Sequence, residues 1–122
     1  MQKAVKLYEE IAQIDPSNAE IHNNLGTIYQ AIGEFSKALA SFDRAISLRP
    51  SEPDYLVNKG KVYELMSKLG EAIKLYRQAI SGNPRSSKAL VALGAAYRAQ
   101  SNYEKAKEQL LMAIRYDVNA WE

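Results

Sequence analysis

Hydrophobic side chains recur every three or four residues along most of the chain, which is the spacing of amphipathic helices. One series of these positions comprises Ile21, Leu25, Ile28, Tyr29 and Ile32. The next series comprises Phe35, Ala38, Leu39, Phe42, Ala45 and Ile46. The pattern predicts helices over residues 2–14, 18–32, 35–48, 53–66, 69–81, 87–100 and 103–116, and it contains no candidate strand.

Local signals agree with these helix ends. Ser17 with Glu20 has the capping-box pattern that begins a helix, and Ser51 precedes another helix whose first turn contains Pro53. Gly33 lies between two hydrophobic series, where a glycine favours the end of a helix. The chain therefore consists of short helices joined by tight turns.

The same residue types return every 34 positions along the chain. The columns that keep this step are Pro16, Pro50 and Pro84; Gly26, Gly60 and Gly94; Tyr29, Tyr63 and Tyr97; Ala4, Ala38, Ala72 and Ala106; and the pairs Ala45-Ile46, Ala79-Ile80 and Ala113-Ile114. Glycine inside a helix costs about 1 kcal/mol relative to alanine, so its return in every unit indicates a close contact. We expect the two helices of each unit to cross at the glycine and alanine columns, because small residues let the backbones approach.

The repeated unit resembles the tetratricopeptide repeat, most clearly in the stretch that reads "LGTIY", "KGKVY" and "LGAAY" in the three copies. Alanine, then Phe42 or Tyr76, then alanine and proline follow at fixed distances. The resemblance implies an all-α fold, a right-handed superhelix (solenoid) of about seven antiparallel helices, whose first helices line a concave groove. It also implies a single domain over 1–122, a fragment of a longer array, made of the second helix of a truncated repeat at 1–18, full repeats at 19–52, 53–86 and 87–118, and a tail at 119–122.

Some positions depart from the family pattern. His22, Leu56 and Leu90 occupy the slot where the family has tryptophan. Lys59 replaces the leucine before the second glycine, and we expect its stem to cover apolar surface while its amine stays in water. Val118 stands where the family has proline. None of these changes the fold that the resemblance implies.

Composition narrows the possible functions. The chain has 122 residues, of which 47% are hydrophobic, and its formal net charge of +2 is too weak to indicate a nucleic-acid or membrane partner. It has no cysteine, and its one histidine, His22, is expected to be a satisfied, half-buried side chain rather than a metal ligand or a base. No glycine-rich phosphate loop is present. We therefore predict no enzyme activity, no cofactor and no metal.

Two features of the sequence bear on its location. The longest apolar runs, such as Leu110–Ile114, have five residues and are too short to cross a bilayer. The first residues lead straight into an amphipathic pattern, without the apolar core of a signal peptide. The sequence therefore favours a cytoplasmic location.

The resemblance implies that a peptide or an extended protein segment binds in the groove lined by the first helices. The side chains expected on this face are Glu20, Asn23, Asn24, Thr27, Gln30, Asp54, Val57, Asn58, Lys61, Glu64, Lys88, Val91, Ala92, Ala95 and Arg98. The strongest candidates among them are Asn23, Asn24, Thr27, Asn58, Lys61, Lys88, Val91, Ala95 and Arg98. We expect the two residues before each "LG" or "KG" to be the most exposed to a ligand.

Asn24 and Asn58 both lie two residues before a glycine, and a column of amides can hydrogen-bond a peptide backbone with little regard for its side chains. This is similar to the asparagine ladder of O-linked N-acetylglucosamine transferase repeats, although it stops at Ala92. A solvated polar slot is the alternative interpretation. Chaperone-binding repeats of this family hold a C-terminal carboxylate with a set of lysine, arginine and asparagine side chains. Only Asn58 and Lys88 match that set in this chain, so we expect no strong binding to chaperone tails.

Two other functions stay open. The chain could be a structural module that self-associates or packs on neighbouring domains, or the recognition segment of a larger enzyme or regulator. Solenoids normally close with a polar helix, and no such helix is expected at either end of this stack, so apolar faces would be left open. We therefore expect self-association through these faces, with a monomer as the alternative. The apolar faces expected to be open are Val5, Tyr8 and Ile11 at one end, and Leu110, Ala113, Ile114 and Trp121 at the other.

Overall fold

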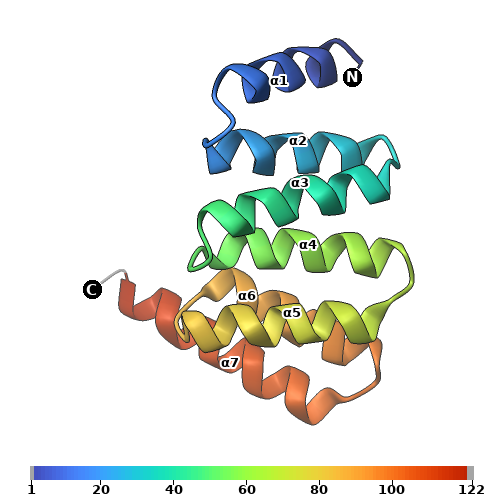
Figure 1. Cartoon of the computed structure of the whole chain (residues 1–122). Helices are drawn as coiled ribbons and strands as arrows, with labels where there is room; N and C mark the ends of the chain where they lie inside the picture. Colours follow the sequence, from blue (N-terminus) through green and yellow to red (C-terminus); the bar gives the residue numbers. More distant parts are fainter. Residues whose placement is uncertain (1, 121–122) are drawn as a thin grey trace.

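The computed structural model describes the backbone of residues 2–120 and the side chains of residues 2–116. This part of the chain forms seven helices and no strand, as the hydrophobic pattern predicts. The helices are α1 (Gln2–Ile14), α2 (Ala19–Ala31), α3 (Phe35–Leu48), α4 (Pro53–Leu65), α5 (Leu69–Gly82), α6 (Ser87–Ala99) and α7 (Tyr103–Ala120). Figure 1 shows them stacked in the order of the sequence, with the two termini at opposite ends of the stack.

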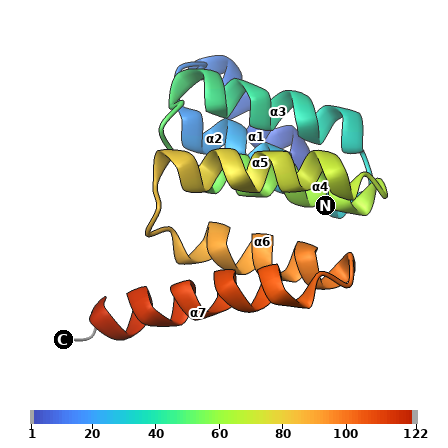
Figure 2. The same ribbon diagram turned by 90° about the horizontal axis from the view of Figure 1, so that it is seen from below.

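Each helix contacts the next one along the chain, and the first helices of the units, α2, α4 and α6, also contact one another in order. In Figure 2, the pair α6 and α7 lies at one end of the stack, away from α1, α2 and α3. Every contact therefore joins close neighbours, as in a solenoid built from two-helix units.

The helix starts differ in detail from the predicted caps. The side chain that caps α2 belongs to Asn18, not to Ser17: its Oδ1 accepts hydrogen bonds from the N–H groups of Glu20 at 3.1 Å and Ile21 at 3.4 Å. Asparagine satisfies these unpaired donors as well as serine does, so the capping-box prediction was wrong by one residue.

Helix α4 begins at the predicted residue, Pro53, but its capping residue differs from the predicted start signal. Glu52, rather than Ser51, is the N-cap, and its carboxylate accepts from the N–H of Asp54 at 3.4 Å. Pro53 occupies the first turn, as predicted.

Gly33, in the turn between α2 and α3, has a φ of +82°, a left-handed conformation that glycine adopts readily. The equivalent residues Ser67 and Ser101 have a φ of 62°, so this turn favours glycine without requiring it.

The last helix is longer than predicted. The hydrophobic pattern predicts an end at residue 116, but α7 continues to Ala120. Earlier second helices end before Pro50 and Pro84, whereas the equivalent position holds Val118, which keeps its backbone N–H. Without proline, nothing forces the helix to stop there.

Each unit is held together where its glycine meets a large side chain. A Cβ added to Gly26 would lie 2.6 Å from the ring of Phe42, and one added to Gly60 would meet the ring of Tyr76. Gly94 lies against Leu110 in the same way, at 2.8 Å. The glycine therefore makes room mainly for the side chain of the second helix, rather than for its backbone as the sequence analysis expected.

The alanine column and the aromatic column form the core. Phe42, Tyr76, Ala38 and Ala72 are fully buried. Leu90, in the slot where the family has tryptophan, is also fully buried. Burial of a large apolar side chain such as Phe42 or Leu90 stabilises the fold by about 1.5–3 kcal/mol, so leucine in the tryptophan slot keeps the core apolar.

Lys59 is half-buried, with its side chain 20% exposed, as expected of a stem that covers apolar surface. Its Nζ lies 2.7 Å from Oδ1 of Asp43 on α3, whose side chain is 56% exposed. The amine thus has a carboxylate partner near the surface, which the sequence did not predict.

Most of the apolar side chains that the sequence predicts to be exposed at the two ends are partly or fully buried. Val5 and Tyr8 are half-buried against α2 and α3, and Ala113 is buried. Leu110 is half-buried beside Gly94. Ile11 is likewise half-buried.

Four large apolar side chains are exposed near the two ends of the stack. They are Leu7 (56%) and Ile14 (84%) on α1, and Leu111 (53%) and Ile114 (59%) on α7. Ile114 is thus the one member of the expected faces that is exposed, while Trp121 lies outside the described residues.

We expect Gly26→Ala to destabilise the fold. Alanine would gain about 1 kcal/mol of helix propensity, but its Cβ would overlap the ring of Phe42, which is fully buried and cannot move away. Overpacking of this kind costs about 1–3 kcal/mol, so a net loss of about 1 kcal/mol should appear in urea unfolding.

Gly70→Ala is the matched control. Gly70 is also helical, but a Cβ there meets no atom within 4 Å. The substitution should therefore raise the free energy of unfolding by about 0.5 kcal/mol. A Gly26→Ala variant as stable as Gly70→Ala would show that the glycine contact does not limit the packing.

Candidate functional site

Polar side chains link the first helices of all three units. Nδ2 of Asn58 on α4 donates a hydrogen bond to Oδ1 of Asn23 on α2 at 2.8 Å. Nζ of Lys88 on α6 donates to Oδ1 of Asn58 at 3.2 Å. We call Asn23, Asn58 and Lys88 the amide row. Asn58 keeps a second N–H and a second lone pair, so both sides of its amide can still bind another group.

The amide row differs from the predicted asparagine ladder. Sequence analysis paired Asn24 with Asn58, 34 residues apart, whereas the bonded partners Asn23 and Asn58 are 35 residues apart. The hydroxyl of Tyr55 also bonds to Glu20 across 35 residues, at 3.0 Å. Stacked first helices are therefore offset by one residue between these units, which the repeat length alone does not reveal.

A pocket lies between α4 and α6 beside the amide row. Lys61 and Glu64 line it from α4, and Ser87, Lys88, Val91, Ala92 and Ala95 line it from α6. Val91 is 47% exposed, although it is a large apolar side chain. The pocket thus offers an apolar surface between two lysines and one glutamate, which we call the α4–α6 pocket.

Most of the candidate residues are accessible in the structure. Thr27, Lys61, Lys88, Val91, Ala95 and Arg98 are exposed, while Asn23, Asn24 and Asn58 are half-buried. The hydroxyl of Thr27 donates a hydrogen bond to the backbone oxygen of Asn23 at 3.1 Å, so its proton is already used within α2. The structure joins Asn23, Asn58 and Lys88 by hydrogen bonds and brings Lys61, Lys88, Val91 and Ala95 to one pocket.

The residues expected to be the most exposed include two that are not. Val57 is fully buried and Ala92 is only 9% exposed, because both pack in the core formed by α4, α5, α6 and α7. The position two or three residues before the glycine therefore faces the neighbouring helix in some units. That difference depends on the packing of the helices and has no signal in a single repeat.

Two glutamates of the expected groove face act as acceptors for buried tyrosines. Glu20 accepts from Tyr55, and Glu64 accepts from the hydroxyl of Tyr76. Burial, followed by the hydrogen bond to Glu64 and its charge, raises the pKa of Tyr76 well above its usual value. Burial and the bond to Glu20 raise the pKa of Tyr55 in the same way. Sequence analysis missed these bonds because the partners come from different helices.

His22 has the structural role that the sequence predicts. Its side chain is half-buried, and its Nε2 lies 2.9 Å from the backbone oxygen of Pro16. Across the described residues, no group of three or more histidine, cysteine, aspartate or glutamate side chains is placed to hold a metal ion. No helix in that part of the chain is long and apolar enough to cross a membrane.

Three models of one family match this arrangement of paired helices. Models described as "Tetratricopeptide repeat" match residues 19–52 and 65–121, and one described as "TPR repeat" matches residues 1–33. The chain belongs to the tetratricopeptide repeat family. Repeats of this family generally mediate protein–protein interactions and are typically non-catalytic.

Solved structures of MamA share the fold. One has a TM-score of 0.85 and 25% sequence identity, over 98% of this tetratricopeptide repeat chain and 70% of the MamA chain. A second has a TM-score of 0.80 and 26% identity, over 95% of this chain and 63% of the other. A third, at 18% identity, has a TM-score of 0.77. The chain thus spans about two thirds of these structures' length, and no curated protein sequence matches it.

We expect Tyr76→Phe to make stability less sensitive to high pH. A tyrosine whose pKa is raised by folding stabilises the fold fully below the unfolded pKa of 10.0. That contribution falls as the pH rises further, because only the unfolded chain loses the proton. Tyr76 alone should lower the free energy of unfolding by about 1.4 kcal/mol per pH unit above about pH 10. The slope of the variant should be smaller by this amount, with the remainder coming from Tyr29 and Tyr55, whose pKa values folding also raises.

Urea unfolding at several values between about pH 9 and pH 11.5 measures the effect. Tyr103→Phe is the control, because Tyr103 is 65% exposed and should leave the slope of the wild type unchanged. Equal slopes for the wild type and Tyr76→Phe would contradict the prediction that Tyr76 stays protonated in the folded chain.

Proposed function

We propose that the chain binds a peptide or an extended protein segment along α2, α4 and α6, and that it acts by binding rather than by catalysis. The observation that carries this proposal is the amide row beside the α4–α6 pocket. The row presents two amides, each with donors and an acceptor, and one lysine ammonium across three consecutive units, and such groups can bond an extended backbone. The pocket beside it offers space for one side chain.

The chemistry of the site favours a particular kind of segment. Val91 and Ala95 offer apolar contact, while Lys61 and Lys88 offer positive charge on either side. An apolar side chain followed by an acidic group would bury the first and pair the second. Because an extended peptide must be ordered on binding, an affinity in the micromolar range, roughly −8 kcal/mol, is expected.

Asn58→Ala tests the proposal. The substitution removes the amide that joins Asn23 to Lys88, so affinity for a groove peptide should fall about tenfold. A peptide array probed with the wild type selects the ligand, and calorimetry then compares the variants. Asn24→Ala is the matched control, because Asn24 is equally half-buried but lies outside the amide row.

The outcomes separate the two interpretations of the asparagines. Loss of affinity with Asn58→Ala alone supports the amide row. Equal loss with both variants supports the ladder that the sequence predicts, and no loss with either removes the amides from the binding mechanism. As part of a larger enzyme or regulator, the chain would bind its ligand in the same way.

A second candidate function is assembly through exposed apolar side chains. Leu111 and Ile114 lie three residues apart on α7, and Leu7 and Ile14 lie on α1, at opposite ends of the stack. The positions equivalent to Ile114, namely Ile46 and Ile80, are packed against the following unit. A second copy that covered these faces would extend the stack head to tail.

Sedimentation over a wide concentration range tests assembly. We expect self-association that weakens when Leu111→Glu and Ile114→Glu are combined, because two charges would enter the apolar contact. Lys107→Glu, on the same helix but already polar and exposed, is the control. A monomer at all concentrations, or an oligomer unaffected by the paired substitution, would rule out assembly through α7.

A further inference from the structure

A hollow outside the groove lies where the first turns of α1 and α3 meet the end of α2. We call it the edge hollow. It is lined chiefly by Lys3, Lys6, Lys37, Val5, Tyr29 and Ile32. None of these side chains lines the α4–α6 pocket or belongs to the amide row. The edge hollow is therefore a separate surface of the same solenoid.

The three lysines of the edge hollow have no carboxylate partners of their own. Ion pairs within 4.0 Å among the described residues join Lys59 to Asp43 and Lys74 to Glu71, and include none of the three. The amine of Lys37 lies 5.8 Å from the centre of the Tyr29 ring. This arrangement leaves the lysines available to an anionic group.

Nearby carboxylates do not cancel this charge. Glu34 lines the edge hollow, so three lysines face one carboxylate there. Glu9 is also close, since burial and then Glu9 raise the pKa of Tyr29, and Glu9 keeps its negative charge. The three lysines thus outnumber two carboxylates. The surface therefore remains positive around an apolar centre.

The apolar centre is open to solvent at one residue in particular. Ile32 is 40% exposed at the end of α2, beside the half-buried Val5. Covering an aliphatic side chain of this size removes apolar area from water, which is favourable by about 25 cal/mol per Å². An occupant that carries one apolar side chain would gain this contact.

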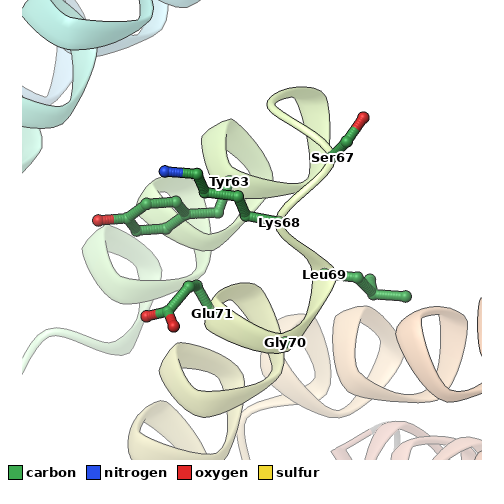
Figure 3. A pocket seen from close by; sticks show the side chains of 6 residues that line it. All are labelled: Tyr63, Ser67, Lys68, Leu69, Gly70 and Glu71. Carbon is green, nitrogen blue, oxygen red and sulfur yellow. The ribbon is translucent and has the colours of Figure 1, made fainter.

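The equivalent place in the next unit provides an internal comparison. Figure 3 shows the pocket at the turn between α4 and α5, where Tyr63, Lys68 and Glu71 extend toward the same side. Lys68 stands at the position of Glu34, and Glu71 at the position of Lys37. One lysine and one glutamate balance each other there. The excess of positive charge in the edge hollow is thus absent from the pocket of the next unit.

We propose that the edge hollow binds an acidic segment of a partner protein. One apolar side chain of the segment packs on Ile32 and Val5, and flanking carboxylates pair with Lys3, Lys6 and Lys37. A protein segment fits better than a nucleic acid, because phosphate backbones are bound by extended basic surfaces and this chain has a net charge of only +2. It also fits better than a membrane, which requires a broad apolar face.

The test uses a fluorescently labelled hexapeptide with a central leucine flanked by glutamates. Fluorescence anisotropy measures its affinity for the wild type and for Lys3→Glu combined with Lys6→Glu. Both lysines are exposed, so the variant should fold, which circular dichroism checks. We expect affinity to fall at least about tenfold, since two attractive contacts become repulsive.

Two control variants locate the binding site. Lys68→Glu changes the same charge in the equivalent pocket of the next unit, and Lys88→Ala removes a lysine of the groove. Both should leave the affinity within about twofold of the wild type. A loss of affinity with Lys88→Ala, but not with the Lys3→Glu and Lys6→Glu double variant, would place the peptide in the groove and overturn the proposal. An equal loss of affinity with Lys68→Glu would show that the peptide binds by non-specific charge attraction, and would also overturn the proposal.

Control ligands test the chemistry of the occupant. Replacing the central leucine by serine should weaken binding several-fold, and unchanged affinity would show that the apolar centre plays no part. Tighter binding to a double-stranded oligonucleotide, or to vesicles containing phosphatidylserine, would assign the edge hollow to a different partner and overturn the proposal. Because no residue is shared with the groove, failure here leaves the groove proposal untouched.

Discussion

The contact between a glycine on the first helix and a large side chain on the second determines how each unit packs. The glycine lacks a Cβ, so a ring or a leucine can fill the space beside the helix backbone. The three contacts are Gly26 with Phe42, Gly60 with Tyr76 and Gly94 with Leu110. Because all units use the same contact, their helices pair in the same way, and each unit presents the next with a similar surface. The regular stack follows from this repetition.

Stacking then places side chains of different units beside one another. Asn23 meets Asn58, and Glu20 meets Tyr55, each across 35 residues. A step one residue longer than the repeat follows from the offset between neighbouring first helices. The Asn23–Asn58 and Glu20–Tyr55 bonds are consequences of this offset, so polar groups of the groove face also help to join the units.

The units share their apolar skeleton and differ in charge. Lys59 pairs with Asp43 where other units have leucine, and Lys68 with Glu71 exchange the signs found at Glu34 and Lys37. Such exchanges leave the core unchanged because they lie on or near the surface. They give each unit its own surface charges and polar groups. The amide row, the α4–α6 pocket and the edge hollow therefore have no exact copies in the other units.

The sequence alone determined the number and type of helices, the repeat and the glycine column, because hydrophobic period and residue spacing are local properties. It also predicted the exposure of several side chains on the first helices, including Lys88 and Val91. It missed the longer α7, the partner of Lys59, the burial of Val57 and the pairing of Asn58 with Asn23. These depend on the offset between stacked helices and on which faces meet. Such features arise only when residues distant in the chain pack together, so only the tertiary structure decided them.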